Sequence, residues 1–385
     1  MTSAESLFWL AAAAVTYTFA GYPILLWALT LWRRRAAPAA KQLPSLSLII
    51  SVHNEEDVLP MKVENALTLE YPRDRFDIIV ASDGSTDRTN EIAARFAGAG
   101  VRLFAVPRQQ GKTLTLNDAV RMAKGEVVVF TDANAMFSHA ALLHLVRNFA
   151  DPRIGFVTGW TLYRASRGSA TSQSARSYGL LETQIKYMES LLHSCVGADG
   201  AIFAIRKVLY ETLAAADIND LVIPLRIIRR GYRGVLEKQA VCEETAEART
   251  DRELSRQIRI HTRTIRAMLS HAALLNPFAY GWFSLSLFSH KLLRLILPFL
   301  LLLLLATSAV LAAQGQPYQA VLELQALFYG LAGIGWTMKN APGLMKYLKL
   351  PFSFVMVNWA IVVAWGRVLA GKKDEMWAPA RRVSA

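Results

Sequence analysis

Long apolar stretches lie near both ends of the chain, and shorter apolar runs alternate with helical patterns between them. Short β-type runs cover residues 46–52, 76–81, 101–106 and 127–131, and helical patterns cover residues 57–67, 86–96 and 112–122. Strands that alternate with helices in this way predict a parallel sheet with helices on both faces. Ligands of such sheets bind beyond the carboxyl ends of the strands.

A second half of this region runs from residue 154 to about 272. We expect a long helix at about 172–192, a strand at 201–206 and a helix at about 220–230. Six arginines then recur at alternating spacings of three and four, which places their side chains along one stripe of a helix. They are Arg249, Arg252, Arg256, Arg259, Arg263 and Arg266.

Several apolar stretches predict contact with a membrane. Residues 7–32 contain no charged side chain and are numerous enough to cross a bilayer with some tilt. Residues 276–289 are rich in aromatic side chains, which suits a helix in the membrane interface, and residues 295–313 and 318–338 are predicted to cross. Residues 350–369 contain Asn358 and Arg367, so we expect an interfacial or re-entrant segment, three crossings and a cytoplasmic C-terminus.

The distribution of charge predicts the orientation and the domains. Arg33, Arg34 and Arg35 follow the first apolar stretch at once, which favours a retained anchor whose following residues lie in the cytoplasm. We therefore expect an N-terminal transmembrane anchor at 1–35 and a cytoplasmic domain at 44–272. Interfacial and transmembrane helices at 276–371 and a basic cytoplasmic tail at 372–385 would follow.

Composition narrows the class of partner. The 385 residues are 53% hydrophobic and carry a net charge of +13. Because aromatic-basic RNA-binding motifs are absent, we attribute this charge to the membrane surface and to phosphorylated substrates rather than to nucleic acid. The two distant cysteines, Cys195 and Cys242, suit a reducing cytosol and do not suggest a zinc site.

Polar side chains follow the predicted strands. Residues 53–55 (His-Asn-Glu) follow the first strand, Asp83 follows the second, and Asp132 follows the fourth. We expect them to converge at one edge of the sheet, where carboxylates can hold a divalent metal and a nucleoside diphosphate. The alternative for Asp83 is a turn or the N-cap of a helix near Thr86. No Gly-x-Gly-x-x-Gly follows the first strand, so a nicotinamide-binding oxidoreductase is not expected.

Seven short motifs in one order closely resemble the family 2 glycosyltransferases, specifically the membrane-bound branch that builds polysaccharides. The motifs lie at residues 51–55, 82–87, 111–112, 132–134, 197–200, 219–220 and 229–232, and the resemblance covers about residues 44–266. It implies a GT-A-type α/β fold with a mixed, mainly parallel sheet flanked by helices. One N-terminal and about two to three C-terminal membrane helices fit this branch of the family.

The resemblance implies a set of donor-binding residues. In this family the residue at the position of Asp83 contacts the donor nucleotide, and Asn54 and Glu55 line the pocket for the base and ribose. Lys112 is expected to approach the diphosphate, with solvation at a helix start as the alternative.

The resemblance also implies a metal site. Asp132 matches the first acid of the family's metal-binding pair, and a hard dication such as Mg²⁺ or Mn²⁺ prefers carboxylate and phosphate oxygens. The second position is Asn134, where aspartate is commoner. Its amide oxygen can ligate a metal, but without charge. The alternative for Asp132 is a simple turn at the end of a strand.

On the acceptor side, Asp220 matches the family's catalytic base, which removes a proton from the attacking sugar hydroxyl. The acid that usually precedes this base is replaced by Asn219, and the alternative for Asp220 is an N-cap of the following helix. Asp199 and Gly200 are expected near the acceptor.

Arg259 is the best match to the arginine of the Gln-x-x-Arg-Trp motif of chain-extending synthases, although Arg256 and Ile260 replace the Gln and Trp. Its guanidinium can clamp a diphosphate, and the alternative is a basic face toward solvent or lipid headgroups. Trp377 and Arg381 resemble residues of a cytoplasmic loop that closes over the site.

The sequence therefore predicts inverting, metal-dependent transfer of a sugar from a UDP-sugar to a lipid-linked or polysaccharide acceptor. The reaction would take place at the cytoplasmic face of a bacterial-type plasma membrane, in the synthesis of extracellular or cell-surface polysaccharide. An alternative is addition of a single sugar to a polyprenyl-linked intermediate, which rests on the residues at Arg256 and Ile260. A transporter with a nucleotide-sugar-binding domain and a nucleotide-sugar-binding pseudoenzyme are rivals from other classes.

Overall fold

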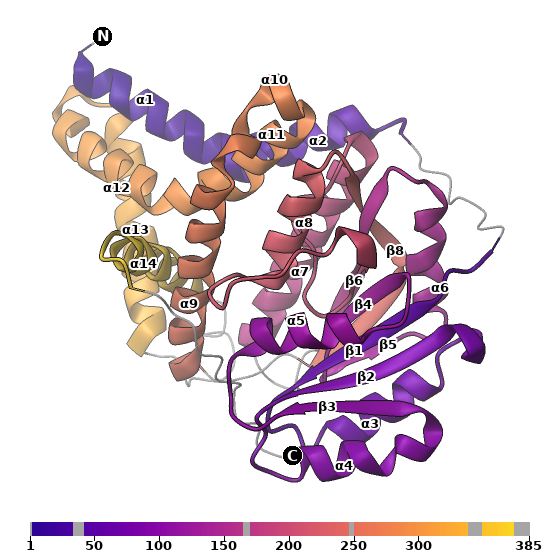
Figure 1. Cartoon of the computed structure of the whole chain (residues 1–385). Coiled ribbons are helices and arrows are strands. Elements are labelled where there is room, and N and C mark those ends of the chain that lie inside the picture. Colours follow the sequence, from indigo (N-terminus) through magenta and orange to yellow (C-terminus); the bar gives the residue numbers. More distant parts are fainter. Residues whose placement is uncertain (1, 34–41, 165–169, 246–249, 338–348, 373–385) are drawn as a thin grey trace. The chain divides into compact units, whose positions relative to one another are not determined.

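The computed structural model describes residues 2–33, 42–164, 170–245, 250–337 and 349–372. The chain divides into two compact units, which are described separately (Figure 1). The sheet unit comprises residues 32–165, 176–247 and 374–385, and the helical unit comprises residues 1–31, 166–175 and 248–373. Arg249 and residues 373–385, which include Trp377 and Arg381 of the predicted tail, lie outside the described residues.

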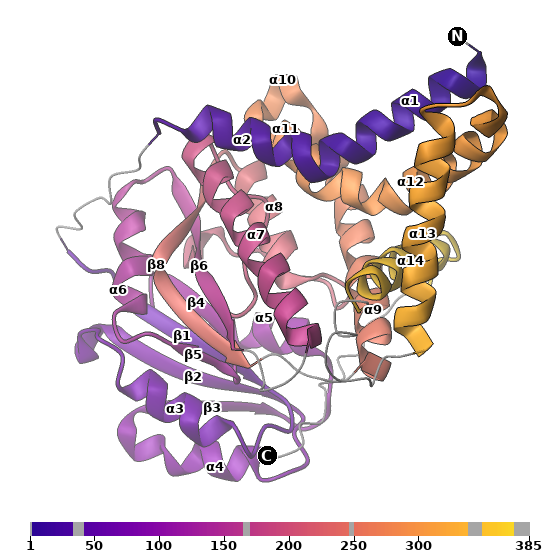
Figure 2. The same cartoon turned by 180° about the vertical axis from the view of Figure 1, so that it is seen from behind.

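The sheet unit is built on an eight-stranded sheet in the order β3-β2-β1-β4-β7-β6-β8-β5 (Figures 1 and 2). β1 pairs parallel with β2 and β4, β2 pairs parallel with β3, and β6 pairs parallel with β8. β7 is antiparallel to β4 and β6, and β5 is antiparallel to β8. The predicted mixed, mainly parallel sheet is therefore confirmed. The strands are β1 (Leu46–Val52), β2 (Phe76–Asp83), β3 (Val101–Val106), β4 (Val127–Asp132), β5 (Ala135–Phe137), β6 (Ile154–Arg164), β7 (Phe203–Arg206) and β8 (Arg233–Thr245).

Helices cover both faces of this sheet, so the central strand β1 is buried along its whole length. Leu48 and Ile50 of β1 pack in one core cluster with Leu59 and Val63 of α3. The opposite face of β1 and β2 is covered by α5. The helices of this unit are α3 (Leu59–Leu67), α4 (Thr89–Arg95), α5 (Lys112–Met122), α6 (Ala141–Val146), α8 (Asn219–Arg229) and the greater part of α7 (Ala170–Leu192).

The register of the parallel strands brings polar residues to one edge of the sheet. Ser51 of β1 lies beside Asp132 of β4, and Val52 of β1 lies beside Ser82 of β2. Because side chains alternate along a strand, Ser51, Asp83 and Asp132 share the face that α5 covers. The carboxyl ends of three neighbouring strands thus place two acids and a hydroxyl in front of the start of α5.

The helical unit contains apolar helices and the basic helix α9 (Thr250–Ser270). Its N-terminal helix runs through α1 (Ser3–Thr16), the π-helical segment η1 (Tyr17–Gly21) and α2 (Tyr22–Thr30). Tyr17 Oη of η1 and Ser289 Oγ share a hydrogen bond of 2.9 Å, which joins η1 to a second π-helical segment. The remaining helices are α10 (Pro277–Tyr280), α11 (Trp282–Ser286), the π-helical η7 (Leu287–Leu292), α12 (Leu293–Leu311), α13 (Tyr318–Thr337) and α14 (Lys349–Leu369).

Three helices in the described part of the chain are long and apolar enough to cross a membrane: Ser3–Thr30, Trp282–Gln314 and Leu350–Leu369. The first two agree with the predicted spans at 7–32 and 295–313. The third is the stretch for which the sequence favoured an interfacial or re-entrant segment. α13, predicted to cross as part of 318–338, is not among the three, because Gln319, Glu323 and Gln325 make it more polar.

Candidate functional site

The loop that follows β1 is tied to the loop that follows β2. Asn54 adopts the left-handed backbone conformation (φ 54°), which asparagine tolerates better than most residues. Its Oδ1 accepts a hydrogen bond from the backbone N–H of Thr86 at 2.8 Å, and its own N–H donates to Ser85 Oγ at 3.1 Å. The N–H of Glu55 donates to Thr89 Oγ1 at 2.8 Å. Asn54 and Glu55, the two residues predicted to line the base pocket, therefore lie on a loop that hydrogen bonds hold to the loop after β2.

Asp83 is buried, with 1% of its surface exposed, and its carboxylate is fully engaged within the protein. It accepts hydrogen bonds from the N–H of Gln110 at 2.9 Å, the N–H of Gly111 at 3.0 Å and the hydroxyl of Thr115 at 2.9 Å. These partners lie at the start of α5 and not at the helix near Thr86. Asp83 therefore holds the segment that presents Lys112 rather than capping the next helix.

Gly84 allows this arrangement because the loop before α5 passes directly over it. A Cβ at Gly84 would lie 2.3 Å from the backbone nitrogen of Gln109, and Gly84 also has a positive φ of 62°. Any side chain at this position would push the loop away from Asp83. Just before α4, Asp87 Oδ1 accepts a hydrogen bond from the N–H of Thr89 at 3.0 Å.

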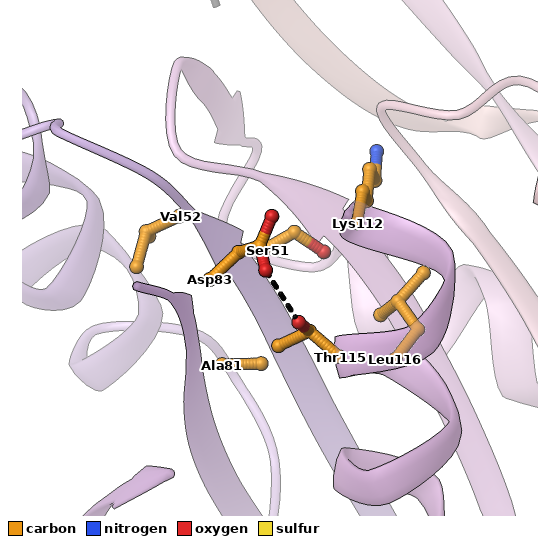
Figure 3. A pocket seen from close by; sticks show the side chains of 7 residues that line it. All are labelled: Ser51, Val52, Ala81, Asp83, Lys112, Thr115 and Leu116. Atoms are coloured by element: carbon orange, nitrogen blue, oxygen red, sulfur yellow. Dashed lines mark hydrogen bonds between the residues drawn. The ribbon is translucent and has the colours of Figure 1, made fainter. Parts of the chain in front are cut away.

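A small pocket lies between β1, β2 and the first turns of α5 (Figure 3). Ser51, Asp83, Lys112 and Thr115 line it, together with Val52, Ala81 and Leu116. Within the described part of the protein, the buried Oγ of Ser51 has no hydrogen-bond partner. Ser51 thus carries a buried hydroxyl whose hydrogen-bonding capacity is not used in this structure. Ser51 was not predicted as a site residue.

Lys112 connects this pocket to Asp132. Its Nζ lies 2.5 Å from Asp132 Oδ1, and both side chains are mostly shielded from solvent. Burial lowers the pKa of Lys112, but the negative charge and hydrogen bond of Asp132 outweigh burial, so the net pKa lies above its ordinary value. The carboxylates of Asp220 and Glu244 act in the same direction. Lys112 is therefore a charged residue surrounded by acids.

The second predicted metal position, Asn134, follows Asp132 in the turn between β4 and β5. Its Nδ2 donates to Glu244 Oε1 of β8 at 2.8 Å. Asp132 and Asn134 together offer hard oxygen atoms of the kind that Mg²⁺ and Mn²⁺ accept. No cluster of three or more His, Cys, Asp or Glu side chains suited to a metal occurs among the described residues. Any cation held here would need further oxygen ligands from a bound ligand or from water.

Two residues of α3 form hydrogen bonds to the segments on either side of the Asp132–Asn134 turn. Lys62 is completely buried, and its Nζ donates to Thr131 Oγ1 at 3.1 Å and to the carbonyl oxygen of Ala135. Burial lowers the pKa of Lys62 to about 7. Three residues along the helix, Asn65 exchanges hydrogen bonds of 2.9 and 2.8 Å with the backbone of Phe137. Lys62 and Asn65 thus fix both sides of the Asp132–Asn134 turn.

The acceptor-side residues form a second group. Asp220 lies in the first turn of α8, and its carbonyl oxygen accepts from the N–H of Ala198 at 2.7 Å. A Cβ at Gly200 would lie 3.2 Å from Asp220 Oδ2, so this glycine lets the turn at 197–200 approach the carboxylate. Asp199 folds back on the same turn, where its Oδ1 accepts from the N–H of Ala201 at 3.0 Å. The structure therefore brings Asp199, Gly200 and Asp220 together.

Lys186 of α7 supports this second group and was not predicted from the sequence. It is buried, and its Nζ donates to the carbonyl oxygen of Ala198 at 3.0 Å. Burial lowers its pKa, but the carboxylates of Glu182, Asp199 and Asp220 help to raise it to a net value above the ordinary one. A buried lysine at a helix position is easily taken for a surface residue, although Ile185 and Glu189 beside it are also buried.

Arg259 belongs to the helical unit and not to the sheet unit that contains these groups. It lies on α9, whose buried residues include Ile258, Thr262 and Ile265. The neighbouring Arg256 forms an ion pair with Glu253 at 3.0 Å on the same helix. Arg256, one member of the predicted arginine stripe, thus has an ion-pair partner on its own helix. This agrees with the alternative in which the stripe is a basic face toward solvent.

Comparisons with known proteins agree with the predicted family. The family model described as glycosyl transferase family 2 matches residues 47–213. Poly-beta-1,6-N-acetyl-D-glucosamine synthase of Staphylococcus aureus is 25% identical over 207 residues, which are 52% of this chain and 50% of that protein. Beta-monoglucosyldiacylglycerol synthase of Nostoc sp. is 32% identical over 119 residues, which are 30% of this chain and 25% of that protein. The chain thus spans at most half the length of these relatives.

A solved structure shares the fold over nearly the whole chain. A mannosyltransferase from Pyrobaculum calidifontis, in complex with GDP-Man and Mn²⁺, has a TM-score of 0.71 and 24% identity, covering 95% of this chain and 100% of that chain. The matched family range contains Asn54, Asp83, Lys112 and Asp132 and ends before Asp220. The predicted GT-A-type fold is confirmed, and the chain carries a family 2 glycosyltransferase domain.

Proposed function

We propose that the chain transfers a sugar from a nucleoside diphosphate sugar, a UDP-sugar by preference, to a hydroxyl of a lipid-linked or polysaccharide acceptor. The anomeric carbon would be inverted. The observation that carries this proposal is the position of Lys112. It lines the same pocket as Asp83, forms an ion pair with Asp132 and lies in the electrostatic field of Asp220. One cationic side chain thus connects the three acids of the proposed reaction.

The donor would bind at the carboxyl edge of β1, β2 and β4. Asn54 and Glu55 would contact the base and ribose, and Ser51 would offer its hydroxyl. Asp83 would act mainly by holding the Gly111 N–H and, through it, the start of α5. Lys112 would bind the diphosphate, because an ammonium next to this pocket is a strong partner for phosphate oxygens. The mannosyltransferase of the same fold was solved with a nucleotide sugar, which supports this class of donor.

Mg²⁺ or Mn²⁺ would be held by the carboxylate of Asp132 and the amide oxygen of Asn134, with phosphate oxygens and water as the other ligands. When bound, the cation would neutralise the charge that develops on the departing nucleoside diphosphate. In this structure Lys112 contacts Oδ1 of Asp132. We infer that Lys112 leaves this oxygen and turns to the diphosphate when the donor binds.

Asp220 would act as general base. A sugar hydroxyl is a weak nucleophile, and a carboxylate within hydrogen-bond reach removes its proton as attack proceeds. The turn at 197–200 packs against this carboxylate, so Asp199 and Gly200 would shape the place where the acceptor hydroxyl enters. Arg259 keeps its predicted role as a diphosphate ligand from its match to the family motif alone.

The three apolar helices favour an amphiphilic acceptor at a membrane, because a tethered enzyme gains little with a freely soluble one. Given Arg33 to Arg35 after the first span, the catalytic side would be the cytoplasmic face. Polysaccharide synthesis is favoured by the Staphylococcus aureus relative, a poly-beta-1,6-N-acetyl-D-glucosamine synthase. Addition of one sugar to a lipid is the second candidate, favoured by the Nostoc relative, a beta-monoglucosyldiacylglycerol synthase.

A screen of UDP- and GDP-sugars for nucleotide release tests the proposal. Membranes that contain the full chain are incubated with each donor, with Mn²⁺ or with EDTA. We expect release from one donor only, and loss of release with EDTA. No release from any donor would contradict the proposed reaction. With excess donor, a ladder of product sizes supports chain extension, and a single product supports single addition.

A further inference from the structure

The proposed metal site has an unusual charge pattern. Asn134 is neutral, so Asp132 alone would bring negative charge to the cation. Glu244 lies next to this position, because Ala135 of β5 is the register partner of Glu244 in β8. The carboxylate of Glu244 also raises the pKa of the buried amines of Lys62 and Lys112. A third acid, far away in the sequence, is thus part of the electrostatic environment of the Asp132–Asn134 turn.

The hydrogen bond between Asn134 and Glu244 determines how the amide is oriented. An ionised carboxylate can only accept hydrogen bonds, so the amide group must turn its nitrogen toward it. Asn134 Nδ2 lies 2.8 Å from Glu244 Oε1, in agreement with this requirement. The other branch of the amide is Oδ1, the one atom of this side chain that can ligate a cation.

We propose that Glu244 is a positioning residue for the metal site, which rests on the function proposed above. By accepting from Nδ2, Glu244 presents Oδ1 of Asn134 to the cation bound with the donor. By its own charge, it replaces the negative charge that an aspartate at position 134 would carry. Groups that orient a metal ligand in this way alter affinity for the metal by about 10- to 100-fold when they are removed.

A charge exchange tests the proposal. Glu244→Gln removes the charge and lets the amide of Asn134 turn over, because glutamine can both donate and accept. Asn134→Asp together with Glu244→Gln moves the charge to position 134 and keeps a hydrogen bond, from the glutamine amide to the new carboxylate. Uptake of Mn²⁺ in the presence of UDP is followed by loss of the free Mn²⁺ signal in electron paramagnetic resonance, with the full chain in detergent.

We expect Glu244→Gln to weaken Mn²⁺ uptake about tenfold or more, and the double variant to return within about threefold of the original protein. Glu243→Gln is the matched control, because it removes the same charge from the neighbouring residue, which points to the opposite face of β8. It should bind Mn²⁺ normally. If Glu244→Gln also binds normally, or if the double variant is as weak as Glu244→Gln, the proposal is wrong.

Failure of the proposed function has a different signature. If only the proposed function is wrong, the original protein takes up Mn²⁺ with UDP and the variants differ in Mn²⁺ uptake as expected above. No sugar donor, however, releases its nucleotide. If the original protein takes up no Mn²⁺ with UDP, both proposals are contradicted.

Discussion

At the scale of single residues, the chemistry depends on small side chains as much as on charged ones. Gly200 is the clearest case, because a Cβ there would meet Asp220 Oδ2 at 3.2 Å. The carboxylate would have to move by a few tenths of an ångström, and transfer reactions are sensitive to such displacements.

Gly200→Ala should therefore lower the turnover number about tenfold while the protein stays folded. Gly98→Ala is the matched control, since a Cβ at Gly98 meets no atom within 4 Å. Nucleotide release and the midpoint of thermal unfolding are measured for both variants. Equal activity of the two would show that the approach of this turn to Asp220 has no role.

Asp220→Asn should reduce transfer at least about 100-fold, because an amide cannot accept the proton of the acceptor hydroxyl. The isosteric change should leave the midpoint of thermal unfolding nearly unchanged. Asp74→Asn serves as control, since the side chain of Asp74 is 81% exposed. If Asp220→Asn keeps near-normal transfer, the role of general base must be given to another residue.

At the scale of elements, the alternating pattern of the first half predicted β1 to β4 and their helices well. It predicted the convergence of Asp83 and Asp132 for the same reason, since parallel strands end at one edge. β8 was missed because Glu237, Lys238 and Gln239 interrupt its alternation, where its register with β6 shifts. Lys62 was missed because a lysine in a helix normally marks the surface, although it lies between the buried residues Leu59 and Val63.

The helix α3 is expected to control the site through Lys62. Lys62→Met should lower transfer about tenfold, because the Asp132–Asn134 turn loses the donor that holds both its ends. Lys207→Met is the control, because Lys207 also donates to a backbone carbonyl, that of Ala123, but at the other end of β4. Comparable losses of transfer in both variants would indicate general destabilisation instead.

The pH dependence of stability gives an independent test of Lys62. Its folded pKa of about 7 lies below its ordinary value of 10.5, so between these values the unfolded chain binds more protons than the folded one. This group therefore makes the unfolding free energy rise with pH from about 7 to about 10.5, by at most about 1.4 kcal/mol per pH unit. Thermal unfolding of Lys62→Met should show a flatter pH profile over this range, and an unchanged profile would contradict the lowered pKa of the buried Lys62 amine.

At the scale of the whole molecule, the proposed cytoplasmic position of the sheet unit predicts a cytoplasmic C-terminal end if the chain crosses the membrane three times, whichever of α13 and α14 is the third crossing. The basic residues around Lys372 favour the same side. A reporter fused after Ala385 that fluoresces only in the cytoplasm should therefore be active, and an alkaline phosphatase fused there should be inactive. The opposite pair of results would require an even number of crossings.

The contact between Lys112 and Asp132 has a consequence for the order of events in a cell. While this contact persists, the ammonium of Lys112 neutralises the carboxylate of Asp132. A free divalent cation would therefore bind weakly to Asp132. The nucleotide and its cation would then have to arrive together as one complex. The rate of the enzyme would follow the cellular level of that complex rather than the level of free magnesium or manganese.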